Sequence, residues 1–236
     1  MIEASYKNSE ELPVVLDQSE ADILALMPRM DWDRPPWNRW SFQRIRSLMP
    51  TAQVWRGNEK IVPIPRQEKE ISQIEFTRSN EVSQTIEAFL DDTYTDGFLV
   101  MADGYIVHES YYNGMRPETP HLMQSVSKSI TSTVTGIMIG RGDLDPSALV
   151  KTYIPELAET AWAGATLQHV LDMTTGVQYS EEYTRLDSDV GKTDVASGWR
   201  PIAPDASPDI NWPVSVWDQI LSLKTCDAEH GSRFLY

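Results

Sequence analysis

The stretch "LMQSVSKSITSTVTGIMIGRGDL" (residues 122–144) decides how the rest of the chain is interpreted. It contains Ser125-Val126-Ser127-Lys128, the only Ser-x-x-Lys in 236 residues. Residues three apart on a helix lie on the same face, so the amine of Lys128 can reach the hydroxyl of Ser125. The apolar residues that follow predict a helix that is buried through its middle, and Gly140 and Gly142 predict its end.

The Ser-x-x-Lys spacing is compatible with two roles for Ser125, a catalytic nucleophile or a helix cap, and the spacing does not choose between them. A lysine amine can take the proton of a serine hydroxyl when burial lowers the lysine pKa, and the start of a helix favours a developing oxyanion. A serine at a helix start is also an ordinary N-cap, and Ser125, Ser127 and Ser129 can each fill that role.

The composition excludes several classes of protein. A formal net charge of −15 argues against nucleic-acid binding and against docking on anionic membranes. Cys226 is the only cysteine, so no intrachain disulfide is expected. The four histidines are far apart, and HExxH, CxxC and Gly-rich phosphate loops do not occur, so no metal site is expected.

The N-terminal residues predict the compartment. They are acidic and show neither a basic n-region nor an apolar h-region, and no stretch approaches the ~18 apolar residues of a membrane span. The sequence therefore predicts a cytoplasmic protein, or a periplasmic one if a leader has been lost.

Three segments differ in composition. Residues 1–30 form an acidic lead-in, residues 31–80 a tryptophan-rich arm and linker, and residues 81–236 the main domain. Tryptophans and basic residues alternate in the arm, which is typical of a nucleic-acid stacking surface or of an arm anchored by its tryptophans. The net charge favours the anchored arm.

The periodicity of the main domain predicts an α+β inventory. Residues 80–97 predict a helix, and residues 98–114 predict a hairpin that turns at Asp103-Gly104. Further helices are predicted within residues 145–157, 165–176 and 214–223, whereas residues 179–213 read as a polar loop. A single hairpin is marginal by itself, so the remaining strands of its sheet are expected outside the chain unless the strand assignments fail.

Several quoted segments carry a resemblance to a known family. They are "RPPWNRWSFQRIRSLMPTAQVWRG", "DDTYTDGFLVMADGYIVHESYYNG", "QSVSKS", "GRGDLDPSALVKTYIPELAETAWAGATLQHVLDMTTGV", "YSEEYTRLDSDV" and "SGWR". In this order, from about Trp32 to Tyr236, the chain resembles the class C β-lactamase and penicillin-binding-protein-like serine hydrolases, within them the 6-aminohexanoate-dimer hydrolases (nylon-oligomer hydrolases). The resemblance implies a β-lactamase/transpeptidase-like fold, an antiparallel sheet with flanking helices plus a helical subdomain. It also implies that the domain is incomplete, with its C-terminal sheet strands missing.

The resemblance also implies site residues. Ser125 matches the nucleophile and Lys128 the lysine of Ser-x-x-Lys. Tyr236, approached by "GSRFLY", matches the tyrosine that opens the second motif and relays the proton. Tyr183, in "EEY", matches a tyrosine that closes over bound amide substrate, although a plain loop tyrosine is the alternative.

The implied chemistry is hydrolysis of a small amide or ester through an acyl-enzyme on Ser125, without metal or organic cofactor. Aminohexanoate oligomers are among the substrates that the resemblance suggests. Asp187 and Asp189 lie in an acidic loop that suits a substrate ammonium group, although an ordinary solvated loop is the alternative that the polar composition favours. The oligomeric state is left open.

A second interpretation is a catalytically inactive truncated remnant that serves as a non-enzymatic scaffold or partner-binding fragment. The third family motif, K-T-G, has no match in the sequence. The terminal carboxylate of Tyr236 is expected to raise the pKa of its phenol and so to disfavour the phenolate. On this view the isolated chain is weakly active or inactive.

Overall fold

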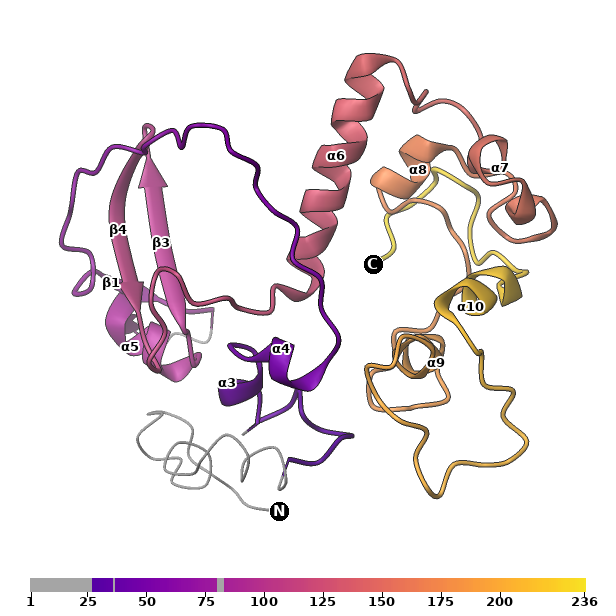
Figure 1. The fold of residues 1–236 in the computed structure, drawn as a ribbon, viewed down its shortest axis with the longest axis horizontal. Helices are drawn as coiled ribbons and strands as arrows, with labels where there is room; N and C mark the ends of the chain where they lie inside the picture. The colour runs from indigo at the N-terminus through magenta and orange to yellow at the C-terminus, as the bar shows by residue number, and fades with distance from the viewer. Residues whose placement is uncertain (1–26, 36, 80–82) are drawn as a thin grey trace. The chain divides into compact units, whose positions relative to one another are not determined.

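The computed structural model describes residues 27–35, 37–79 and 83–236. The chain divides into two compact units, Met1–Leu122 and Met123–Tyr236 (Figure 1). Apart from residues 27–30, the predicted acidic lead-in lies outside the described residues. The division into lead-in, arm and domain stays a prediction.

The predicted hairpin is confirmed. Strands β3 (Gly97–Ala102) and β4 (Tyr105–Tyr111) pair antiparallel, with a register shift between Val100 and Met101. The turn has two left-handed residues, Asp103 at φ 51° and Gly104 at φ 80°, as the tightest hairpin turns require.

A second small sheet was not predicted. Strands β1 (Glu75–Thr77) and β2 (Ser83–Thr85) pair antiparallel and lead into helix α5 (Ile86–Asp92). The helix predicted over residues 80–97 is therefore too long at both ends among the described residues, because Gly97 already belongs to β3 and the observed helix ends at Asp92. It begins only at Ile86, because the hydroxyl of Thr85 caps it by accepting a hydrogen bond from Ala88 N at 3.1 Å.

Part of the predicted linker pairs with the hairpin. Backbone N–H groups of Gln67 and Lys69 donate to the carbonyls of Ile106 and Val107 at 2.9 and 2.8 Å, and Ile106 N donates back to Pro65 at 2.9 Å. The extended run that begins at Pro63 and Pro65 therefore lies beside β4.

The arm anchors on its own unit through two tryptophans. It carries helices α3 (Asn38–Ser41) and α4 (Ile45–Leu48), and Trp32 and Trp40 are buried. Trp55 is exposed. The anchored-arm prediction holds for the first two, and their burial argues against a stacking surface made of all the tryptophans.

A polar cluster with two buried members, Asp96 and Arg39, ties this arm to the hairpin and is called the Asp96 cluster. It consists of Asp96, Arg39, Asn113 and His121. The Asp96 carboxylate lies 3.4 Å from Arg39 Nη1 and accepts from Asn113 Nδ2 at 3.2 Å and from His121 Nε2 at 3.0 Å. The hydrogen bond to Asp96 is the main cause of a raised pKa at His121.

The second unit is mostly helical. Its elements are η2 (Gln124–Val126), α6 (Ser127–Arg141), α7 (Val150–Tyr153), η3 (Pro155–Glu159), α8 (Leu167–Leu171), α9 (Asp189–Ala196) and α10 (Val216–Ser222). Two apolar clusters, Val150/Leu157/Ala165 and Ala161/Val177/Leu223, form its core, and Trp162 packs against both. Helix α9 corrects the predicted polar loop, since Ser188 caps it by accepting from Gly191 N at 3.1 Å.

Helix α6 confirms one expectation and contradicts another. It ends at Gly142, which has the left-handed φ of 81°. None of its residues is buried, however, and Ile130 and Val134 are 68% and 52% exposed. Ile130, Val134 and Ile137 are spaced three or four residues apart and so share one face of the helix, and this apolar face is exposed in the described structure.

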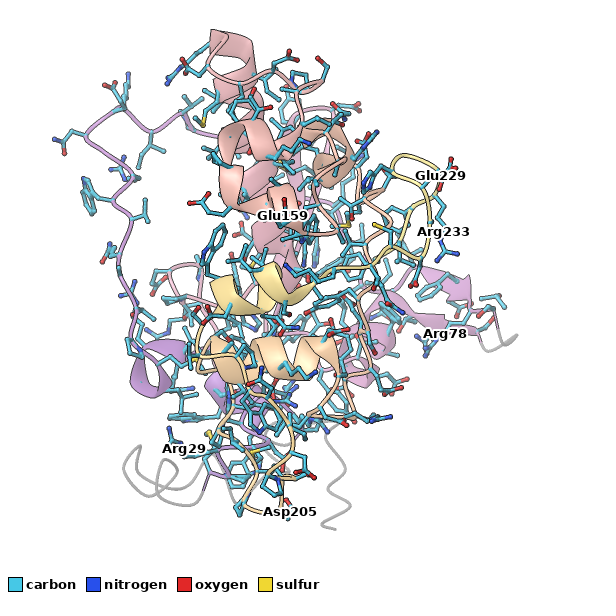
Figure 2. The ribbon with its side chains drawn as sticks, turned by 90° about the vertical axis from the view of Figure 1, so that its right-hand side faces the viewer. Arg29, Arg78, Glu159, Asp205, Glu229 and Arg233 are labelled. Carbon is cyan, nitrogen blue, oxygen red and sulfur yellow. The ribbon has the colours of Figure 1, made fainter. Side chains whose placement is uncertain are left out.

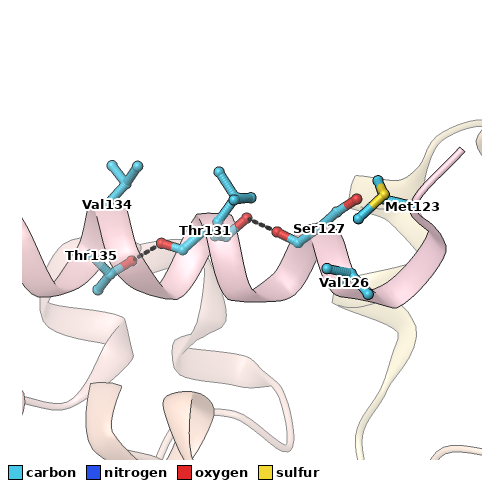
Figure 3. A pocket seen from close by; sticks show the side chains of 7 residues that line it. Met123, Val126, Ser127, Thr131, Val134 and Thr135 are labelled. Carbon is cyan, nitrogen blue, oxygen red and sulfur yellow. Dashed lines mark hydrogen bonds between the residues drawn. The ribbon is translucent and has the colours of Figure 1, made fainter. Parts of the chain in front are cut away.

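One face of this helix lines a shallow pocket of about 600 Å³ (Figure 3). There the hydroxyls of Thr131 and Thr135 turn back to the carbonyls of Ser127 and Thr131, at 3.3 and 3.0 Å. These bonds satisfy the hydroxyls locally and leave mainly methyl groups toward the pocket. Within the described part of the chain, no helix is long and apolar enough to cross a membrane.

Candidate active site

Ser125 stands in the single turn η2, directly before α6. The residue before it, Gln124, has φ 47°, a left-handed conformation that is uncommon for a residue other than glycine. The N-cap of α6 is Val126, which makes no side-chain capping bond. The cap role that the sequence left open for Ser125 is therefore not used, and its hydroxyl faces Lys128 instead.

Lys128 connects the serine to a tyrosine that is distant in sequence. Its Nζ donates to Ser125 Oγ at 2.8 Å and to the Tyr236 hydroxyl at 3.5 Å. The same Nζ lies 5.2 Å from the centre of the Tyr236 ring, so the cation also faces the aromatic ring. Three of the predicted site residues thus come together, and all three are exposed.

The electrostatics of this group favour the phenolate of Tyr236. The hydrogen bond from Ser125 is the main cause of a lowered phenol pKa, and the hydrogen bond and charge of Lys128 add to it. This direction is opposite to the one expected from the terminal carboxylate. The lowered pKa makes the phenolate form of Tyr236 easier to reach beside the serine hydroxyl than in an ordinary tyrosine.

Tyr183 lies at the edge of this group. Its hydroxyl donates to Glu181 Oε2 at 3.1 Å, and burial raises its pKa to about 12, with the charges of Glu181 and Tyr236 adding to the effect. Glu181 also acts to raise the pKa of Tyr236. Sequence reasoning did not select Glu181, although it stands beside the matched tyrosine in "EEY".

The two aspartates expected to face a substrate are engaged by other groups of the same unit. Both Asp187 oxygens accept from Arg185, at 3.0 and 2.7 Å. Asp189 accepts from the backbone of Ser180 at 2.9 Å and from Gln219 Nε2 at 3.4 Å. Their contacts are those of residues that order the loop before α9.

A metal centre is not assembled from the described residues, in which no three His, Cys, Asp or Glu side chains gather. The chemistry that the arrangement can perform is proton transfer between Ser125, Lys128 and Tyr236. Such a serine with a cationic neighbour and a second proton acceptor is the arrangement of an activated nucleophile.

Comparison with known proteins defines the class. The model of the Beta-lactamase family matches residues 82–221, and the chain belongs to this family. The match includes Ser125, Lys128 and Tyr183, whereas Tyr236 lies beyond it. The β-lactamase-like fold predicted from the sequence is thereby confirmed, with its mixture of helices and sheets.

Two relatives are more particular. The chain is 36% identical over 176 residues to the "6-aminohexanoate-dimer hydrolase" of Paenarthrobacter ureafaciens, with 73% of this chain and 43% of that protein covered. A solved structure named "Putative 6-aminohexanoate-dimer hydrolase from Bacillus anthracis" matches with a TM-score of 0.77 and 26% identity, over 90% of this chain and 54% of that one. The chain therefore spans about half the length of these relatives.

Proposed function

We propose that the chain carries the nucleophile of a serine hydrolase that cleaves a small amide or ester through an acyl-enzyme on Ser125. One observation carries the proposal: Lys128 Nζ lies within hydrogen-bonding reach of both Ser125 Oγ and the Tyr236 hydroxyl. Membership of a family of hydrolases supports it.

In this proposal Tyr236 and Lys128 act together as the base. The proton of Ser125 passes to the phenolate oxygen of Tyr236, and the ammonium of Lys128 stabilises the phenolate by hydrogen bonding. The serine oxygen then attacks the substrate carbonyl, the leaving amine or alcohol takes the proton, and water later releases the acyl group. The backbone N–H of Ser125 supplies one oxyanion donor, worth about 3 kcal/mol.

The proposed substrate class includes aminohexanoate oligomers, which the name of the Paenarthrobacter relative suggests. Glu181, rather than Asp187 or Asp189, is the acidic side chain whose charge acts on Tyr183 and Tyr236. A carboxylate at that edge suits the ammonium end of such an oligomer, because opposite charges attract most strongly over short distances. No cofactor takes part in the proposed reaction.

The test is intact-mass spectrometry after incubation with a fluorophosphonate. We expect one adduct on the chain and on Ser127→Ala, the matched control one residue into α6, and no adduct on Ser125→Ala. The proposal would be contradicted if the original chain stayed unlabelled although circular dichroism showed it to be folded, or if Ser125→Ala were labelled as strongly as the original chain.

A second candidate is a non-enzymatic scaffold or partner-binding fragment. The exposed apolar side chains of α6, Ile130 and Val134 among them, favour it. Light scattering separates the candidates: assembly that Ile130→Lys abolishes supports the scaffold, and a monomer with a labelled Ser125 supports the enzyme.

A further inference from the structure

Tyr236 is the last residue of a segment that backbone hydrogen bonds hold in place. Residues 227–235 lie along the turn 173–176, and the carbonyl groups of that turn accept from them. The bonds are Asp227 N to Gly176 O (2.8 Å), Gly231 N to Thr174 O (2.7 Å) and Leu235 N to Met173 O (2.9 Å). The last of these bonds immediately precedes Tyr236.

His230 supplies the one side-chain bond between the segment and this turn that the described contacts record. Its Nδ1 lies 2.5 Å from the carbonyl oxygen of Thr175. Because a carbonyl oxygen only accepts, Nδ1 carries the proton. Thr175, which accepts this bond from His230, lies between Thr174 and Gly176, which accept backbone bonds. Each of the four carbonyl oxygens of residues 173–176 therefore accepts a hydrogen bond from the segment 227–235.

The ring of His230 packs closely against neighbours on two sides. It stacks on His169 of α8, with ring centres 6.2 Å apart and planes at 26°. A Cβ added at Gly164 would stand 2.8 Å from His230 Cδ2, and one added at Gly231 would stand 2.9 Å from His169 Nε2. The glycines therefore leave the space that the two rings occupy.

The turn that accepts these bonds is itself held. Met173 has φ 55°, and Thr174 N donates to His169 O at 2.8 Å, which ties the turn to the end of α8. By contrast, Glu229 and Arg233 on the same segment (yellow in Figure 2) are exposed. Among these neighbours, His230 is the side chain directed at the turn.

We propose that His230 is a positioning residue, which locks residues 227–235 onto the turn 173–176 so that the Tyr236 hydroxyl stands beside Lys128 and Ser125. The relay role of Tyr236 rests on the proposed function, whereas its placement by His230 does not. His230 touches none of the reacting atoms and acts only through the segment.

The experiment compares three substitutions at one position. Asparagine places its Nδ2 donor near the position of the histidine Nδ1, whereas glutamine and alanine do not. The first readout is the titration of Tyr236 by NMR on chain labelled with ¹³Cζ-tyrosine, with Tyr236→Phe identifying the signal. The second is the rate of fluorophosphonate labelling of Ser125. His108→Ala, on the hairpin of the other unit, is the matched control.

We expect His230→Ala and His230→Gln to move the Tyr236 titration upward toward the ~10 of an ordinary tyrosine and to slow labelling roughly tenfold or more. His230→Asn and His108→Ala keep the titration and rate of the original chain. If His230→Ala does not fold, the comparison of His230→Gln with His230→Asn tests the proposal instead.

The proposal would be overturned if His230→Gln left both the titration of Tyr236 and the labelling rate of Ser125 unchanged. It would also be overturned if His230→Asn gave the same titration and rate as His230→Gln, or did not fold. Failure of the proposed function looks different. In that case Ser125 is not labelled in the original chain, while the titration of Tyr236 still depends on the residue at position 230.

Discussion

Asp96→Asn is the substitution that most directly tests what holds the first unit together. The Asp96 and Arg39 side chains are only 7% and 9% exposed, and every recorded partner of the Asp96 oxygens is a donor: Arg39 Nη1, Asn113 Nδ2 and His121 Nε2. Asparagine keeps the shape of the side chain but turns one oxygen into a second donor. It also leaves the guanidinium of Arg39 buried beside a neutral group.

The size of the effect follows from that burial. Removing one partner of a buried ion pair costs about 3 to 5 kcal/mol, because the other charge stays out of water without compensation. With a urea m-value of ~2 kcal/mol/M, the unfolding midpoint falls by about 1.5 M or more. Asp91→Asn, an exposed residue of α5, is the matched control and changes stability by less than ~0.5 kcal/mol.

The assay is urea unfolding followed by tryptophan fluorescence, because Trp32 and Trp40 are buried in the same unit. Double substitution with Arg39→Met provides a further check, since it removes the stranded charge and should restore part of the loss. An Asp96→Asn midpoint within ~0.3 M of that of Asp91→Asn would refute the argument.

Three further outcomes follow from other parts of the structure. Because its folded pKa is raised, His121 contributes stability that is present below its unfolded pKa of ~6.5 and is lost as pH rises through the folded value. The urea midpoint of unfolding should therefore fall between pH 6 and pH 9, and a fall of the same size in His121→Gln would contradict this. Gly176 has φ 64°, and Gly176→Ala would place a Cβ 2.3 Å from the carbonyl oxygen of Ala228, so we expect the free energy of unfolding to fall by ~2 kcal/mol or more. Gly136 of α6 has open space around it, so Gly136→Ala should raise the free energy of unfolding by roughly 0.5 kcal/mol. Thermal melts that show equal effects would count against the close approach of Gly176 to Ala228. Tyr236→Phe should slow labelling of Ser125 by about 10²-fold, and an unchanged rate would assign the proton transfer to Lys128 alone.

Features that depend on near neighbours were predictable from the sequence. Asp103-Gly104 specifies a tight hairpin because both residues accept a positive φ, and Gly142 ends α6 for the same reason. The approach of Lys128 to Ser125 follows from helical spacing alone. The family, and with it the fold class, could be recognised from ordered motifs.

Short elements stabilised by distant contacts were not predictable. Strands β1 and β2 have three residues each, and most of those residues are polar, so their pattern is too short to recognise. Helix α9 contains glycine and two aspartates and has weak intrinsic propensity. It forms where Ser188 caps it and Asp189 bonds Ser180, contacts that depend on the surrounding loop.

In the candidate site, too, contacts between near neighbours were predictable and contacts between distant residues were not. The pairing of Ser125 with Lys128 could be predicted from the order of residues, because three residues of one helix turn set their distance. The family resemblance implied Tyr236, but no local pattern did: it is 108 residues beyond Lys128, and only the folded chain shows its hydroxyl 3.5 Å from the lysine amine, with a lowered phenol pKa. Local geometry repeats wherever the spacing repeats, whereas a contact between distant residues exists only once the turn 173–176 and the segment 227–235 have folded together.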